Sequence, residues 1–178
     1  MFLIGAMTIV EIVDYFNGFS VFQKIINFKT KKAILWVFSG LAFILSAIID
    51  NLTATIVLIS ILQKVVSDKN LRIWYAALIV IAANAGGALS PIGDVTTTML
   101  WIGDKVSTPM LIQYLLIPSI ACAVAATGIA SLLPAFKGEI KLNPVKDEGN
   151  KYSFRMLALG LGSIVCVPVF KIITHLPP

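Results

Sequence analysis

Apolar stretches separated by short polar segments make up nearly all of this sequence. A helix that crosses a bilayer needs about 20 apolar residues, each adding about 1.5 Å of length. The pattern therefore predicts an all-α, polytopic membrane protein, with residues 1–178 forming a single membrane domain. Its expected parts are a helix end and cytoplasmic connector at 1–32, a helical pair at 33–66, an interrupted helix at 73–106, and spanning helices at 110–136 and 154–174.

The helical pair at 33–66 is interrupted by the polar run Asp50-Asn51-Leu52-Thr53. Its second arm, 54–66, has only 13 residues, which is too short to cross a bilayer comfortably. Basic residues lie at both open ends of the pair, and an excess of Lys and Arg marks the cytoplasmic side. We therefore expect a re-entrant hairpin that enters from the cytoplasm, with its polar tip buried in protein or facing a water-filled cavity.

The stretch at 73–106 is too long for one span and contains glycines, a proline and an acid near its middle. Glycine lacks the Cβ that restricts the backbone, and Pro91 has no N–H to continue the helical hydrogen bonds. The backbone from about Gly86 to Asp94 should therefore be unwound. This predicts a discontinuous helix whose free carbonyl and amide groups are available to a ligand.

Charged residues are scarce and unevenly placed. The chain is 58% hydrophobic and 13% charged, whereas soluble domains carry about 25% charged residues. The net charge of +5 comes from basic clusters at the ends of apolar stretches, which is typical of membrane topology rather than of a nucleic-acid surface. The expected partner is the lipid bilayer, with no nucleic acid. We expect an integral, multi-pass protein of a prokaryotic inner membrane, and a piece of a longer polypeptide.

Asp50 and Asp94 are acids that the pattern places inside the membrane, each at an interruption of an apolar helix. A charge at the bilayer centre costs about 2.5–3.5 kcal/mol on insertion scales, so such carboxylates are functional candidates by default. Half-helix ends at the same places expose unpaired backbone groups. Sodium is a hard cation that prefers oxygen ligands. The sequence therefore predicts a site at which Asp50 and Asp94 bind sodium and exchange protons.

Further oxygen ligands are expected from polar side chains near the two interruptions. These are Asn51, Thr53, Asn84, Ser90, Thr96 and Thr97. Helix capping explains part of the same pattern, because the carboxylate of Asp94 precedes a half-helix and can accept bonds from the N–H groups of Thr96 or Thr97. Capping leaves an oxygen for a cation, so the two roles can coexist. Thr96, Thr97 and Thr98 cannot all face one site on a helix with 3.6 residues per turn.

Three titratable residues lie near segment ends. Glu11 and Asp14 are three residues apart and share a helix face. Glu11 is a candidate proton relay, although a helix running into an interfacial loop would carry the same acids without function, which is the interpretation we favour for Asp14. His175 lies at the end of the chain, where we expect a solvated helix terminus.

The sequence at both interruptions resembles the NhaD-type sodium/proton antiporters of the ion transporter superfamily. The residues that carry the resemblance are Asp50-Asn51-Leu52-Thr53, the stretch 5–14 (GAMTIVEIVD) and the long run 84–102 (NAGGALSPIGDVTTTMLWI). Members often have a histidine after the acid at the position of Asp14, whereas this chain has Tyr15 and Phe16. This departure argues against a pH-sensing role at that position.

The resemblance implies a transporter built from two inverted repeats, of which this chain is the first. In that superfamily the first repeat holds a re-entrant hairpin and a discontinuous helix, whose tips form half of the site in a transport domain that moves against a scaffold. The second repeat, missing here, would be the partner that completes the site, and a homodimer is left open. No cofactor is expected beyond the transported sodium or lithium and protons.

Three function hypotheses remain. The first is a secondary transporter, not an enzyme, that exchanges sodium or lithium for protons because both compete for the same carboxylates. The second is a superfamily carrier of a small anion such as a dicarboxylate, citrate or arsenite, against which two acids at the tips argue. The remote third is an intramembrane aspartyl protease, in which two aspartates share one proton, but Ile49 and Pro91 stand where that family has tyrosine and glycine.

Overall fold

The computed structural model describes residues 2–16, 18, 30–140 and 152–174, and the regular elements in this part of the chain are all helices. The helices are α1 (Phe2–Tyr15), α3 (Lys31–Ile48), α4 (Asn51–Val65), α5 (Lys69–Leu89), α6 (Val95–Ile102), α7 (Thr108–Leu132), the short 3₁₀ helix η1 (Pro134–Phe136) and α8 (Ser153–Thr174). Over the described residues the only extended pairing is an isolated bridge between Thr30 and Glu139. The prediction of an all-α protein is confirmed, and His175 lies outside the described residues.

Within the described part of the chain, three helices are long and apolar enough to cross a membrane. They are α3, α5 and α7, with 18, 21 and 25 residues. The helix α4 is apolar but shorter, in agreement with the expectation that the second arm of the helical pair is too short to span. The last predicted span coincides with α8, although its crossing of the membrane stays a prediction.

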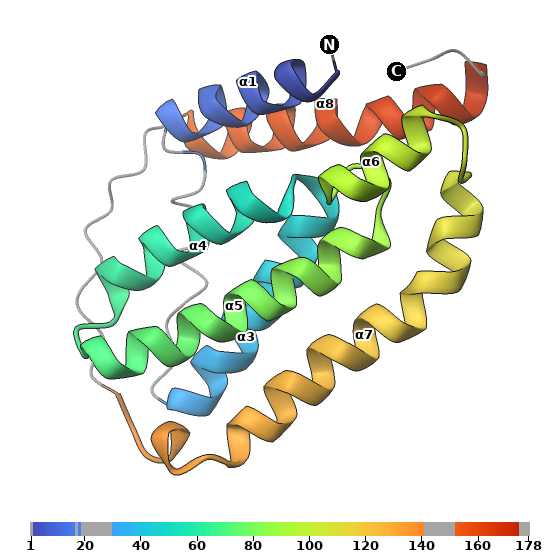
Figure 1. The fold of residues 1–178 in the computed structure, drawn as a ribbon. Helices are drawn as coiled ribbons and strands as arrows, with labels where there is room; N and C mark the ends of the chain where they lie inside the picture. Colours follow the sequence, from blue (N-terminus) through green and yellow to red (C-terminus); the bar gives the residue numbers. More distant parts are fainter. Residues whose placement is uncertain (1, 17, 19–29, 141–151, 175–178) are drawn as a thin grey trace.

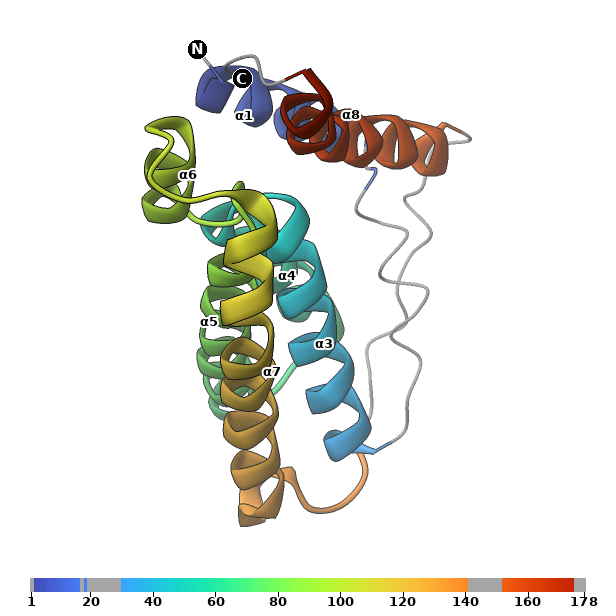
Figure 2. The same cartoon turned by 90° about the vertical axis from the view of Figure 1, so that its right-hand side faces the viewer.

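The helices form two packed groups (Figure 1). In the larger group, α3 packs against α4, α5 and α7, and α5 also contacts α4 and α7. In the smaller group, α1 packs along α8. The pair of α1 and α8 lies across one end of the larger group (Figures 1 and 2), where α8 contacts α3.

The helices α3 and α4 form a hairpin whose open end coincides with the start of α5 (Figure 1). The hydroxyl of Tyr75 in α5 donates to the carbonyl of Lys31 at the start of α3, at 2.8 Å. The ring of Tyr75 is fully buried, 6.3 Å from the Phe38 ring and 5.3 Å from the Phe136 ring. This aromatic cluster holds the starts of α3 and α5 together at the end of the bundle that is remote from the hairpin tip.

Two predicted boundaries are wrong by a few residues. The polar tip was expected to occupy four residues, yet α4 already begins at Asn51, because the carboxylate of Asp50 caps its first turn. The backbone was expected to unwind from about Gly86, yet α5 continues to Leu89 and only residues 90–94 leave the helix. Glycine weakens a helix without ending it, and here the glycines serve close packing instead.

Candidate functional site

The hairpin tip reverses the chain within Ile49 and Asp50. Helix α3 ends when the N–H of Ile49 bonds to the carbonyl of Leu45 at 2.9 Å. Helix α4 starts when Oδ1 of Asp50 accepts the N–H of Thr53 at 2.7 Å, which satisfies one of the unpaired donors of a helix start. Asp50 is half-buried. Its carboxylate therefore stands at the positive end of α4, with Oδ2 not used by the cap.

The break between α5 and α6 is built in a similar way over residues 90–94. Pro91, Ile92 and Gly93 are buried, and half-buried Asp94 precedes α6. Oδ2 of Asp94 accepts the N–H of Thr96 at 3.0 Å. The capping hypothesis for Asp94 is confirmed. Like Asp50, Asp94 lies where a helix begins.

Glycines allow the two interruptions to approach each other closely. A Cβ on Gly86 would collide with the carbonyl oxygen of Phe43 in α3 and lie 2.8 Å from its Cα. A Cβ on Gly93 would collide with the carbonyl of Ser46 and lie 2.7 Å from the carbonyl of Gly87. The sequence predicted an unwound backbone from Gly86 onward. In the structure, Gly86 and Gly87 instead belong to the continuous helix α5 and form part of its contact surface.

Asn51 joins the hairpin tip to the break. Its backbone N–H donates to the carbonyl of Gly93 at 2.9 Å. Its side-chain Nδ2 donates to Oδ1 of Asp94 at 3.1 Å and to Oδ1 of Asn84 at 3.0 Å. Asn84 in turn donates from Nδ2 to the carbonyl of Val80 at 2.8 Å. Three of the predicted site residues thus lie in one cluster around Asn51, with Asn84 33 positions and Asp94 43 positions away from it in the sequence.

The remaining predicted ligands have separate roles. The hydroxyl of Thr97 donates to the carbonyls of Ser90 and Asp94, at 3.1 and 2.9 Å, and so braces the break. Oγ of Ser90 accepts the N–H of Ile92 at 3.4 Å. Thr96 is exposed, and like half-buried Thr53 it contributes its backbone N–H to a cap. Thr98 is fully buried and bonds the carbonyl of Asp94, as expected of a threonine that serves the helix.

Glu11 is not brought into this cluster. It is exposed on α1, whose packing partner is α8 rather than α4, α5 or α6. A role as proton relay stays a prediction, and it would have to act at a distance from the tip and the break. Asp14 is also exposed on α1.

Sequence reasoning missed Ser46. Its buried hydroxyl donates to the carbonyl of Ala83 at 2.6 Å, and this bond ties α3 to α5 about one turn before the tip and about two turns before the break. A serine four residues before Asp50 in an otherwise apolar run was the available signal. A hydroxyl on a membrane helix commonly bonds a carbonyl of a neighbouring helix.

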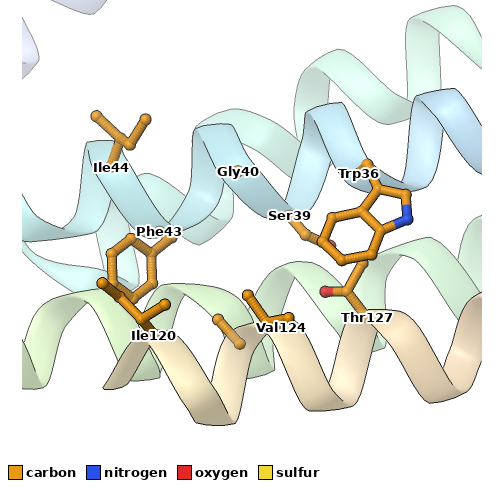
Figure 3. A pocket seen from close by; sticks show the side chains of 9 residues that line it. Trp36, Ser39, Gly40, Phe43, Ile44, Ile120, Val124 and Thr127 are labelled. Carbon is orange, nitrogen blue, oxygen red and sulfur yellow. The ribbon is translucent and has the colours of Figure 1, made fainter. Parts of the chain in front are cut away.

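An apolar groove of about 180 Å³ lies elsewhere, between α3 and α7 (Figure 3). Its walls include Trp36, Phe43, Ile120 and Val124, and its lining holds no ionisable side chain. A groove of this composition has no oxygen cage to offer a cation. The carboxylates that the sequence indicated lie away from this groove, at the hairpin tip and the break.

The cluster offers oxygen ligands suited to a hard cation, and its described residues lack the grouping of side chains typical of a transition-metal site. Among the described residues, no group of three or more His, Cys, Asp or Glu side chains could hold a metal ion. The donors are instead the carboxylates of Asp50 and Asp94, the amide oxygen of Asn51 and carbonyls at the helix ends. Such donors suit an alkali cation and are able to bind protons as well.

Comparison with known proteins identifies the family of this chain. The citrate transporter family matches residues 1–178. The chain belongs to the citrate transporter family. This member is 44% identical over 99% of its length to sodium/proton antiporter 1 of Arabidopsis thaliana. It is 40% identical, again over 99% of its length, to sodium/proton antiporter 2 of the same plant, and 33% identical over its whole length to the Na⁺/H⁺ antiporter NhaD of Vibrio parahaemolyticus.

The resemblance to NhaD-type antiporters is confirmed by these relatives. The chain spans 31% of the first plant relative and 43% of the other two. No solved structure matches this family member. The matching family is one of transporters and these relatives are named antiporters, which argues against an enzyme. The apolar helices agree with an integral membrane protein. The protease hypothesis is therefore not carried further.

Proposed function

We propose that this chain is part of a secondary transporter that exchanges sodium or lithium for protons, with the ion bound where the hairpin tip meets the break. The observation that carries the proposal is the crossing at Asn51, which brings Asp94 next to the tip that carries Asp50. Each carboxylate caps a helix and keeps further lone pairs. The names of the relatives, sodium/proton antiporter and Na⁺/H⁺ antiporter, support the same cargo.

The transport of sodium would be coupled to that of protons because both compete for the carboxylate oxygens of Asp50 and Asp94. A half-buried carboxylate is costly to keep charged without a partner, and either a proton or a cation removes that cost. A site with room for one of them expels the other when it is filled. Sodium entering from one side and protons from the other would then use Asp50 and Asp94 in turn.

We further propose that the α3–α4 hairpin is re-entrant. The support is that α4 has only 15 residues and that the start of α3 and the start of α5 lie at the same end of the bundle. A Lys31→Cys and a Lys69→Cys variant of the full-length protein should therefore react with an impermeant maleimide from the same side of the membrane. Labelling of the two positions from opposite sides would contradict the hairpin.

The chain should act as one of two inverted repeats in a longer protein, because it spans less than half of the relatives named above. The second repeat would complete the ligand set around Asp50 and Asp94. The group of α3 to α7 would then be the moving transport unit, and the pair of α1 and α8 part of the scaffold. The relatives come from plants and bacteria, so the prokaryotic inner membrane, like the homodimer, stays a prediction.

A second function keeps the fold and changes the cargo to a small anion. It is favoured by the name of the family, citrate transporter. The starts of α4 and α6 would also attract an anion, because helix N-termini carry partial positive charge. Against it, both of these helix starts are already neutralised by an aspartate.

The test is transport by the full-length protein in everted vesicles from cells without antiporters of their own. We expect addition of sodium or lithium to dissipate a preformed proton gradient, and potassium or choline to have little effect. Radiolabelled citrate or succinate should not accumulate above the level of empty-vector vesicles. Anion uptake without sodium-dependent proton movement would replace the antiport proposal with the anion carrier.

A further inference from the structure

A chain of hydrogen bonds fixes which end of the Asn84 amide faces the site. The carbonyl of Val80 can only accept a hydrogen bond, so the group of Asn84 that contacts it at 2.8 Å must be the Nδ2 donor. The opposite end of the same amide, Oδ1, then faces Asn51. It accepts the Asn51 Nδ2 group at 3.0 Å. The orientation of Asn84 is thus set by its own helix.

The orientation of Asn51 follows in turn. An amide NH₂ group has two hydrogens, and in Asn51 one is directed to Asn84 and the other to Asp94 at 3.1 Å. Both donors are therefore in use, while no donor among the described residues is bonded to Oδ1 of Asn51. Of the Asn51 side chain, only this oxygen is left for a cation.

We propose that Asn84 is a positioning residue that acts through Asn51 and is not itself an ion ligand. This inference rests on the proposed sodium/proton exchange and deepens it. The two ends of an amide have nearly the same shape but opposite polarity, so a half-turn of Asn51 would present hydrogens to the cation in place of oxygen. Asn84 and Asp94 each accept one of these hydrogens, and together they hold the oxygen in place.

The alternative assigns the Asn84 oxygen directly to sodium. That oxygen already accepts a bond from Asn51, and the side chain is exposed on α5, a turn or more before the break. Both assignments predict a lower sodium affinity when Asn84 is replaced. They differ in whether Asn84→Ala still lowers the sodium affinity of a protein in which Asn51 has already been replaced.

The first measurement is the sodium dependence of proton movement in everted vesicles that contain full-length Asn84→Ala protein. Without its partner, the amide of Asn51 spends part of its time turned the wrong way. We expect the apparent KM for sodium to rise about tenfold, equivalent to the loss of about 1.4 kcal/mol of binding free energy, while the rate at saturating sodium stays within about twofold. A KM within about twofold of the wild-type value would overturn the proposal.

The second measurement separates positioning from direct binding by a double-mutant cycle. Sodium affinity is read from sodium-dependent thermal stabilisation of the purified full-length protein, in backgrounds carrying Asn51→Ala or Asn51→Ser. Neither replacement has an amide to orient. Adding Asn84→Ala should therefore change the affinity by less than about twofold in either background. A further loss of the full tenfold would make Asn84 a ligand in its own right and refute the positioning role.

A matched control is Ser60→Ala on α4. The hydroxyl of Ser60 donates to the carbonyl of Ile56, four residues earlier, just as Asn84 donates to Val80, but it contacts no residue of the cluster. This variant should keep wild-type KM. If the wild-type protein itself shows no sodium-dependent proton movement, the proposed function fails. If the wild type transports and only the Asn84 results disagree, the proposed function stands and the positioning role falls.

Discussion

The hairpin tip and the break use the same device at their ends and differ in how they reach it. In both, an aspartate closes the interruption and caps the next helix, Asp50 through the N–H of Thr53 and Asp94 through that of Thr96. The tip needs two residues and no glycine, because it only has to reverse the chain. The break spans 90–94 and includes Pro91 and Gly93, because α6 has to leave the line of α5 while the backbone of Gly93 stays close to the Ser46 carbonyl of α3.

This difference assigns separate duties to the two interruptions. The tip supplies the side chain that links them, since Asn51 donates both from its backbone and from its amide. The break supplies acceptors, namely the carbonyl of Gly93 and the carboxylate of Asp94. A donor-rich tip and an acceptor-rich break fit together, whereas two tips of the same kind would leave buried groups unpaired.

The largest effect is expected from replacing either of the capping aspartates, which are the feature that the two interruptions share. Asp50→Asn or Asp94→Asn should abolish sodium-dependent proton movement by the full-length protein, because an amide cannot alternate between a proton and a cation. Asparagine caps helices about as well as aspartate, so membrane insertion and expression should stay normal. Near-wild-type exchange by either variant in everted vesicles would reduce that aspartate to a cap.

The next effect concerns Gly86 in α5, which allows this helix to pack closely against α3. Gly86→Ala forces a methyl group into the backbone of Phe43, and overpacking of this kind typically costs about 1–3 kcal/mol. We expect a lower midpoint of thermal unfolding in detergent. Gly128→Ala on α7, where nothing lies within 4 Å of the added Cβ, is the control and should leave the midpoint unchanged. Equal midpoints for the two variants would mean that the close approach of α3 and α5 is not needed.

A smaller effect is expected at the bond that ties α3 to α5. Ser46→Ala removes the buried hydroxyl that donates to Ala83 at 2.6 Å, and loss of one such hydrogen bond costs about 1 kcal/mol. Thermal unfolding of the purified full-length protein measures it. Ser163→Ala on α8 removes an exposed hydroxyl that bonds only within its own helix, and it should be neutral. If Ser46→Ala were as stable as Ser163→Ala, the bond from Ser46 to Ala83 would make no measurable contribution to stability.

The smallest effect compares neighbours on α6. Thr97→Val should lower the unfolding midpoint slightly, because its hydroxyl braces the carbonyls of Ser90 and Asp94 across the break. Thr96→Val should be silent in stability, since Thr96 contributes its backbone N–H to the cap and its side chain is exposed. A large loss of sodium affinity in Thr96→Val, measured in vesicles, would instead restore Thr96 as an ion ligand.

The sequence predicts the positions of the helices here because the polar interruptions are so sharply set against apolar surroundings. Asp50 and Asp94 could be selected for the same reason, since a carboxylate in an apolar run is rare and costly. The role of Gly86 and Gly87 could not be read from the sequence, because glycine favours both an unwound backbone and close helix packing. Which of the two applies depends on α3, a partner 40 residues away in the chain.

The bond from Ser46 to Ala83 and those from Asn51 to Asn84 and Asp94 could not be predicted from the sequence either. They depend on the rotation of α3 and α4 relative to α5, which a hydrophobic pattern leaves undetermined. From the sequence alone, the hydroxyl and amide side chains near an interruption could not be assigned to their hydrogen-bond partners. Only their partners distinguish a cap such as Asp94, a brace such as Thr97 and the donor Asn51.

The crossing at Asn51 has a consequence for how the protein is made. The side-chain bonds of Asn51 reach residues 33 and 43 positions away, and the nearby bond from Ser46 to Ala83 spans 37 positions. All of these residues lie between Ser46 and Asp94. Protein segments are synthesised and fold from the N-terminus onward, and contacts of short sequence separation form early. The cluster around Asn51, where we propose that the ion binds, can therefore assemble as soon as α6 has left the ribosome and entered the membrane. Any later helices would be inserted against a template that already exists.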